Sequence, residues 1–125
     1  MIMSLFQVAL GGAFGASLRY LTNVATMRAF GPGFPLATII VNVAGSFLMG
    51  VLVVVLAHKG GMRFAPFLMT GVLGGFTTFS AFSLDAFTIW ERGETGLAMA
   101  YVLGSVMLSL AAIMIGILVT RGILA

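Results

Sequence analysis

The chain has 125 residues, of which 61% are hydrophobic and only 7% charged, and its mean hydropathy is +1.20. A soluble domain of this length could not bury so much apolar surface, because small domains have a high surface-to-volume ratio. The net charge of +3 is too small to indicate a nucleic-acid partner, and the absence of cysteine excludes disulfides, thiolate metal sites and cysteine nucleophiles.

Four uncharged runs make up most of the chain, at residues 1–18, 35–57, 64–84 and 95–120. Each has at least 18 residues, and a helix needs about 20 to cross the hydrocarbon core of a bilayer. We therefore predict an all-α membrane protein with one multi-pass domain over residues 1–125. Its four transmembrane helices are expected at approximately 2–26, 34–57, 64–90 and 95–120, with a break in the third near 74–80.

The first predicted span has small residues along its length and a basic residue at its end. Small residues four apart let helices pack closely in lipid, but they are common in membrane bundles and indicate oligomerisation only weakly. Arg19 lies near the end of the span, where we expect it to snorkel outward or to pair at the interface. The small pairs are Gly11 with Gly15 and Gly12 with Ala16, and Gly71 with Gly75 repeats the spacing in the third span.

The second predicted span carries Asn42, Ser46 and Gly50 on one stripe at four-residue spacing. The Asn42 amide can donate two hydrogen bonds. Two interpretations stay open, because a buried asparagine can serve a polar pathway or can simply hold two helices together.

The third predicted span contains the segment GGFTTFSAF at residues 74–82. Gly74 and Gly75, followed by Thr77, Thr78 and Ser80, indicate a helix interruption near the middle of the membrane. Carbonyls freed by such a break can hold a cation, and freed amides or hydroxyls can meet an anion. The alternative is a kinked helix whose hydroxyls bond back to the preceding turn.

Phe79 and Phe82 lie three residues apart on one face just after this interruption. Phenyl rings in membranes usually serve as packing bulk. A ring edge is electropositive, however, so beside a polar break two phenyl edges can contact an anion without offering it a full charge.

The fourth predicted span repeats the polar theme with Tyr101, Ser105 and Ser109, a ladder of hydroxyls four residues apart. No ionisable residue lies at the middle of any span, where it would mark a proton relay or a cation pathway. Asp85, near the end of the third span, is expected to snorkel outward or to pair at the interface. With no nucleophile–base pair, metal cluster or phosphate loop, the residues indicate a neutral, donor-lined route for a small anion and no enzyme.

Lysine and arginine are almost evenly divided between the two ends of the predicted bundle. An excess of these residues normally marks the cytoplasmic side. Here one end has three basic residues and the other has two, or three if Arg19 snorkels outward. Either a weak bias selects one orientation, or both orientations insert and pair as an antiparallel dimer. The two sets are Lys59, Arg63 and Arg121 at one end and Arg28 and Arg92 at the other.

Three segments resemble the signature segments of the Fluc (CrcB) fluoride channel family. They are GGAFGASLRY at 11–20, VNVAGSFLMG at 41–50 and TGVLGGFTTFSAFS at 70–83, in the order of that family, and the resemblance covers essentially the whole chain. It implies an antiparallel, dual-topology homodimer with two pores in the bacterial cytoplasmic (inner) membrane. It also implies passive export of cytoplasmic fluoride, which gives fluoride resistance.

The same resemblance implies roles for individual residues. Arg19 would draw anions into a vestibule, and the backbone carbonyls of Gly74 and Thr77 would hold a structural Na⁺ at the dimer interface. The implied fluoride pathway consists of Asn42, Thr78, Phe79, Ser80, Phe82, Tyr101, Ser105 and Ser109.

Two other functions are considered. A small dual-topology multidrug-type transporter would resemble its relatives in carrying a glutamate in the first span, but residues 1–18 contain no acid. A non-transporting membrane scaffold would need only packing residues and would leave three polar helix faces unexplained.

Overall fold

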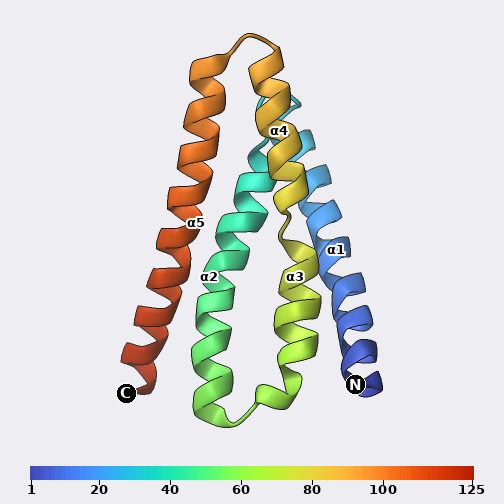
Figure 1. Cartoon of the computed structure of the whole chain (residues 1–125), viewed down its shortest axis with the longest axis vertical. Helices are drawn as coiled ribbons and strands as arrows, with labels where there is room; N and C mark the ends of the chain where they lie inside the picture. The colour runs from blue at the N-terminus through green and yellow to red at the C-terminus, as the bar shows by residue number, and fades with distance from the viewer.

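Four helical spans run back and forth between the two ends of the molecule in the computed structural model, which describes residues 1–125 (Figure 1). All four are long and apolar enough to cross a membrane, which confirms the predicted four-span architecture. Both termini lie at the same end. The spans are α1 (Ile2–Phe30), α2 (Leu36–Lys59), a composite third span, and α5 (Thr95–Leu124); the third consists of η1 (Met62–Phe64), the π-helical η2 (Pro66–Leu73), α3 (Gly74–Phe76) and α4 (Phe79–Glu91).

The third span is interrupted as predicted, but the interruption is shorter than the sequence indicates. Gly74 and Gly75 remain helical, and only Thr77 and Thr78 leave the helix. Their backbone is extended, with φ/ψ of −88°/159° and −153°/119°. Neither glycine therefore breaks the helix, and Gly75 has a different purpose.

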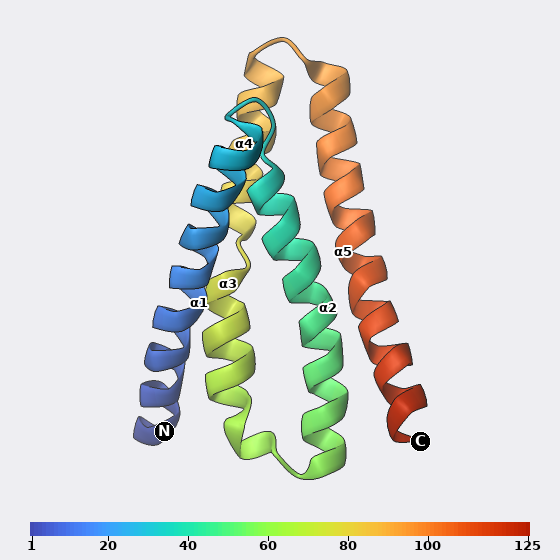
Figure 2. The same ribbon diagram turned by 180° about the vertical axis from the view of Figure 1, so that it is seen from behind.

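That purpose is close packing against α1, which lies beside η2 and α3 (Figure 2). A Cβ on Gly75 would lie 2.9 Å from the carbonyl oxygen of Gly12, and a Cβ on Gly15 would collide with the carbonyl oxygen of Val72. Gly11 and Gly71 meet in the same way. The small-residue spacing thus joins two spans of one chain.

Gly15→Ala should destabilise the protein, because its methyl group must push α1 away from η2; we expect a loss of about 1–3 kcal/mol, as for other overpacked sites. Gly12→Ala is the matched control on the same helix, since nothing lies within 4 Å of its Cβ. Thermal stability of the purified protein in detergent would be compared. Equal melting temperatures for the two variants would contradict this account of the packing.

The third span packs against different helices before and after the break. η2 and α3 pack against α1, whereas α4 packs against α5. α2 packs closely against α5, because a Cβ on Gly50 or Gly116 would collide with the backbone of the other helix. The start of α4, the middle of α2 and the middle of α5 consequently surround one polar region.

Most large apolar side chains face outward. Only 17 of 125 residues are buried, and the largest buried cluster contains just Phe82, Ile89, Ala98 and Tyr101. An exposed apolar surface of this extent must be covered by lipid or by another protein chain.

Candidate functional site: a polar break between three spans

The extended backbone at Thr78 is held by a side chain from α2. Asn42 Nδ2 donates to the Thr78 carbonyl oxygen at 3.0 Å, and the Thr78 amide donates to Asn42 Oδ1 at 2.8 Å. A backbone group left unpaired inside a membrane costs several kcal/mol. This pair of hydrogen bonds therefore makes the break in the helix tolerable. Asn42 therefore fits both interpretations of a buried asparagine. It holds the second and third spans together, and it does so at the polar break.

The hydroxyls after the break have local partners. Thr78 Oγ1 accepts from the Ala81 amide at 3.2 Å and thereby caps the start of α4, as threonine commonly does. Thr78 Oγ1 and Ser80 Oγ lie 3.3 Å apart. Thr77 Oγ1 instead donates to the Leu73 carbonyl oxygen at 2.9 Å, so its proton bonds back to the preceding turn.

A cavity of about 350 Å³ lies where α2, the break and α5 meet. No ionisable side chain borders it. The predicted pathway residues that it brings together are Asn42, Thr78, Phe79, Phe82, Ser105 and Ser109, and Ser46 borders it as well. Neither Ser80 nor Tyr101 borders this cavity.

Phe79 and Phe82 lie beside each other at the cavity, with ring centroids 5.5 Å apart and planes tilted by 45°. Their surroundings differ, because Phe82 is 8% exposed and Phe79 is 77% exposed. Phe82 also packs against the Tyr101 ring, at 5.4 Å between centroids. The two phenyls thus form a pair with one ring anchored in the chain and the other at its surface.

The predicted hydroxyl ladder of α5 divides into two parts. Ser105 Oγ is buried and has no hydrogen-bond partner, so it is free to donate into the cavity. The Tyr101 hydroxyl points elsewhere, since it donates to Asp85 Oδ2 at 3.0 Å. Thr38 Oγ1 donates to the same oxygen at 2.7 Å. Asp85 therefore pairs with two other spans of the same chain.

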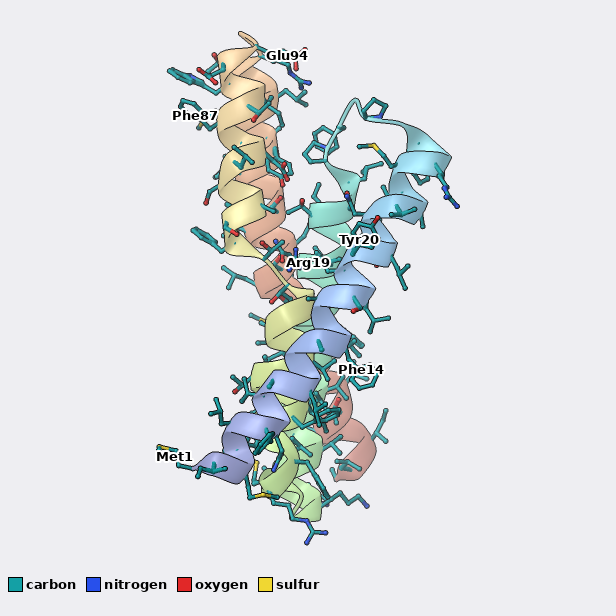
Figure 3. The ribbon with its side chains drawn as sticks, turned by 90° about the vertical axis from the view of Figure 1, so that its right-hand side faces the viewer. Met1, Phe14, Arg19, Tyr20, Phe87 and Glu94 are labelled. Atoms are coloured by element: carbon teal, nitrogen blue, oxygen red, sulfur yellow. The ribbon has the colours of Figure 1, made fainter.

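Arg19 does not snorkel outward. Its Nε donates to the Gly75 carbonyl oxygen at 2.9 Å, and Figure 3 shows it at mid-height, level with the break. A cation is favourable at the C-terminal end of a helix, where carbonyls lack partners in a following turn. Arg19 also borders a second cavity, of about 290 Å³, together with Asp85 and Thr78.

Carbonyl oxygens are the groups that could hold a cation near the break. The chain has no cluster of three or more His, Cys, Asp or Glu side chains, so a bound metal ion would have to be held by neutral oxygens. Gly74 begins the short helix α3 and Thr77 follows it; Thr77 is extended, which removes its carbonyl from the helical ladder. This set suits a hard monovalent cation better than a transition metal.

Comparison with known proteins identifies the family of this chain. A family described as "CrcB-like protein, Camphor Resistance (CrcB)" matches residues 6–117. The chain is 73% identical over 125 residues to a protein of Cereibacter sphaeroides called "Fluoride-specific ion channel FluC", with all of both chains covered. Proteins with the same name from Paracoccus denitrificans, 60% identical over 119 residues and 95% of each chain, and Agrobacterium fabrum, 47% identical over 124 residues, 98% of this chain and 99% of the relative, are also similar.

Proposed function

The chain belongs to the CrcB family, and we propose that it is a fluoride-specific ion channel through which cytoplasmic fluoride leaves the cell passively. It is a multi-pass bacterial membrane protein and not an enzyme. The observation that supports the channel best is the cavity at the break, which is bordered by neutral donors and phenyl rings and by no ionisable side chain. Because the chain belongs to this family, we favour the channel over the two alternative functions, a multidrug-type transporter and a membrane scaffold.

Fluoride is small and strongly hydrated, so a pore must replace its water shell with closely spaced donors. Asn42 uses one amide hydrogen on Thr78 and has a second available, because an amide nitrogen carries two. Ser105 brings a hydroxyl without a partner, and Ser109 borders the cavity one turn further along α5. Thr78 and Ser80 add hydroxyls at the start of α4. Tyr101 then contributes through its packing against Phe82.

The absence of a full charge keeps fluoride mobile. A cation fixed in the narrowest part would bind the ion tightly and slow its release, whereas conduction needs binding weak enough to leave. Phenyl edges carry only partial positive charge. Phe79 and Phe82 therefore suit an ion that has lost its water and must still move on.

The membrane potential is sufficient to drive export. Moving one charge across 100 mV is worth about 2.3 kcal/mol. At about 1.36 kcal/mol per factor of ten, this corresponds to a gradient of roughly 50-fold. A cell with a negative interior can therefore keep its fluoride low through a passive channel.

A second, antiparallel copy is part of the proposal. The exposed Phe79 ring at the cavity needs a cover that excludes water, and a partner chain would supply it. The charge count also supports dual topology. Because Arg19 is bonded inside the protein, the ends carry three and two basic residues, which is nearly no bias. Two such cavities would give a dimer two pores.

A structural Na⁺ at the dimer interface completes the proposal. The carbonyls of Gly74 and Thr77, at the two ends of the short helix α3, would hold it, and neutral oxygens fit such an ion. When bound, Na⁺ would supply a fixed positive charge that joins the broken spans of two subunits.

Liposomes containing the purified protein should release fluoride far faster than chloride, by about 100-fold or more, because a donor-lined path fits larger halides poorly. Ion-selective electrodes would record efflux of each halide under an imposed potential. Efflux should rise with a potential that drives anions outward. Similar rates for both halides, or no dependence on potential, would contradict the proposed function.

A further inference from the structure

A third cavity, of about 240 Å³, opens near the end of the molecule opposite the two termini. Figure 3 shows α4 and α5 diverging from α1 and α2 toward this end, which carries Glu94. Asn23, Thr38 and Asp85 border both this cavity and the one that contains Arg19. Shared lining residues place the two cavities next to each other, and the one that contains Arg19 extends to Thr78 at the break.

Few side chains in this outer cavity can donate to an anion. Thr26 Oγ1 donates to the Thr22 carbonyl oxygen at 2.7 Å, and Thr88 Oγ1 donates to the Leu84 carbonyl oxygen at 2.8 Å. Both hydroxyl protons are therefore already in use. The exposed amide of Asn23 remains, together with the guanidinium of Arg92.

Charge in the outer cavity comes from two residues that border it, Arg92 and Asp85. Asp85 Oδ2 accepts hydrogen bonds from both Thr38 and Tyr101, which partly satisfy its negative charge. Arg92 is the only cationic group at this cavity. It lies in the turn that follows α4 at this end of the molecule, and its side chain is partly exposed, so it is placed to meet ions from solution.

Glu94 acts on Arg92 from outside the cavity. Arg92 Nη2 lies 3.0 Å from Glu94 Oε2, and the two side chains are 43% and 50% exposed. An exposed ion pair of this kind contributes little to stability, with a median of about 0–1 kcal/mol. Glu94 does not border the cavity. Its main effect there is to offset the positive potential of Arg92.

We propose that Arg92 is an anion-recruiting site at the entrance of the outer cavity and that Glu94 sets its strength. The inference rests on the proposed function, because it assigns the residue that collects fluoride before it reaches Arg19 and the break. Asp85 accepts two hydrogen bonds within the protein, whereas Arg92 lies in the turn after α4, and a positive potential at an entrance raises the local concentration of anions and their rate of arrival. Such an effect acts on the rate at low fluoride and not on the selectivity of the path beyond.

The test is fluoride efflux from liposomes at low fluoride, measured at about 10 mM and about 1 M of an impermeant salt. Arg92→Gln should lower the rate at low salt by about twofold to fivefold, and Glu94→Gln should raise it by about twofold. Both effects should vanish at high salt, where the Debye length falls to about 3 Å. The Arg92→Gln/Glu94→Gln double variant should return close to the wild-type rate, since the net charge is restored.

Two matched controls separate the site from overall charge. Arg28→Gln and Glu91→Gln make the same charge changes at the same end of the molecule. Arg28 borders none of the three cavities, and Glu91 forms no ion pair with Arg92, unlike Glu94. Their effects should be clearly smaller. Equal effects of Arg28→Gln and Arg92→Gln would overturn the inference, and so would wild-type rates in the Arg92 and Glu94 variants. If the wild-type protein conducted no fluoride, the proposed function itself would fail, and the inference with it.

Discussion

Fluoride efflux should fall about 100-fold or more when Phe79 is replaced by isoleucine, because an alkyl group offers a dehydrated anion no electropositive edge. A 100-fold loss corresponds to about 2.7 kcal/mol, which is modest beside the cost of leaving a charge unpartnered in an apolar site. Phe79 is 77% exposed within the chain, so isoleucine there removes little packing between the helices. Fluoride-electrode recordings from reconstituted protein would give the rates.

Phe82→Ile should cause a similar loss of efflux but with a lower melting temperature. Phe82 is 8% exposed and packs on Tyr101, so its replacement also disturbs the buried cluster. Phe87→Ile is the matched control, since Phe87 lies exposed on the same helix and borders none of the cavities. Wild-type efflux in both Phe79→Ile and Phe82→Ile would remove the phenyl pair from the pathway.

The number of spans could be predicted because it depends on a local property. An uncharged run of about 20 residues can be read without knowledge of its neighbours. The break could be predicted for the same reason, since TTFS follows two glycines with only Phe76 between them. The exact position of the break could not, because Gly75 is used to approach Gly12 of another span.

The directions and hydrogen-bond partners of individual side chains could not be predicted from the sequence. Four-residue spacing correctly placed Tyr101, Ser105 and Ser109 on one face of α5, but it could not show that the Tyr101 hydroxyl finds Asp85 on α4. Arg19 and Gly75 are 56 residues apart, and nothing in either local segment indicates their contact. Such pairs are decided by how the spans pack.

Thr38 was missed, although a signal for it was present. It lies one turn before Asn42 on the stripe that continues to Ser46, and the same spacing would have included it. The stripe serves two purposes in the structure. Thr38 holds Asp85, whereas Asn42 holds the break.

Asn42→Leu should impair both folding and efflux more severely than any other single change on α2. It removes both bonds to Thr78, and each buried backbone group left without a partner costs about 1–3 kcal/mol. We therefore expect a loss of about 2–6 kcal/mol in stability, with little protein eluting as a single species in detergent. Ser46→Ala, one turn along the same face, should retain nearly full stability.

Asn42→Asp separates the structural part of this role from the conductive part. A carboxylate can still accept from the Thr78 amide, but it has no proton for the Thr78 carbonyl oxygen. It would also bring a negative charge to a cavity that has no ionisable side chain. We therefore expect a smaller loss of stability than in Asn42→Leu together with abolished efflux, both measured on the same reconstituted samples. If Asn42→Asp conducted fluoride at the wild-type rate, Asn42 would be a packing residue alone, and the anion would have to pass the break without its amide.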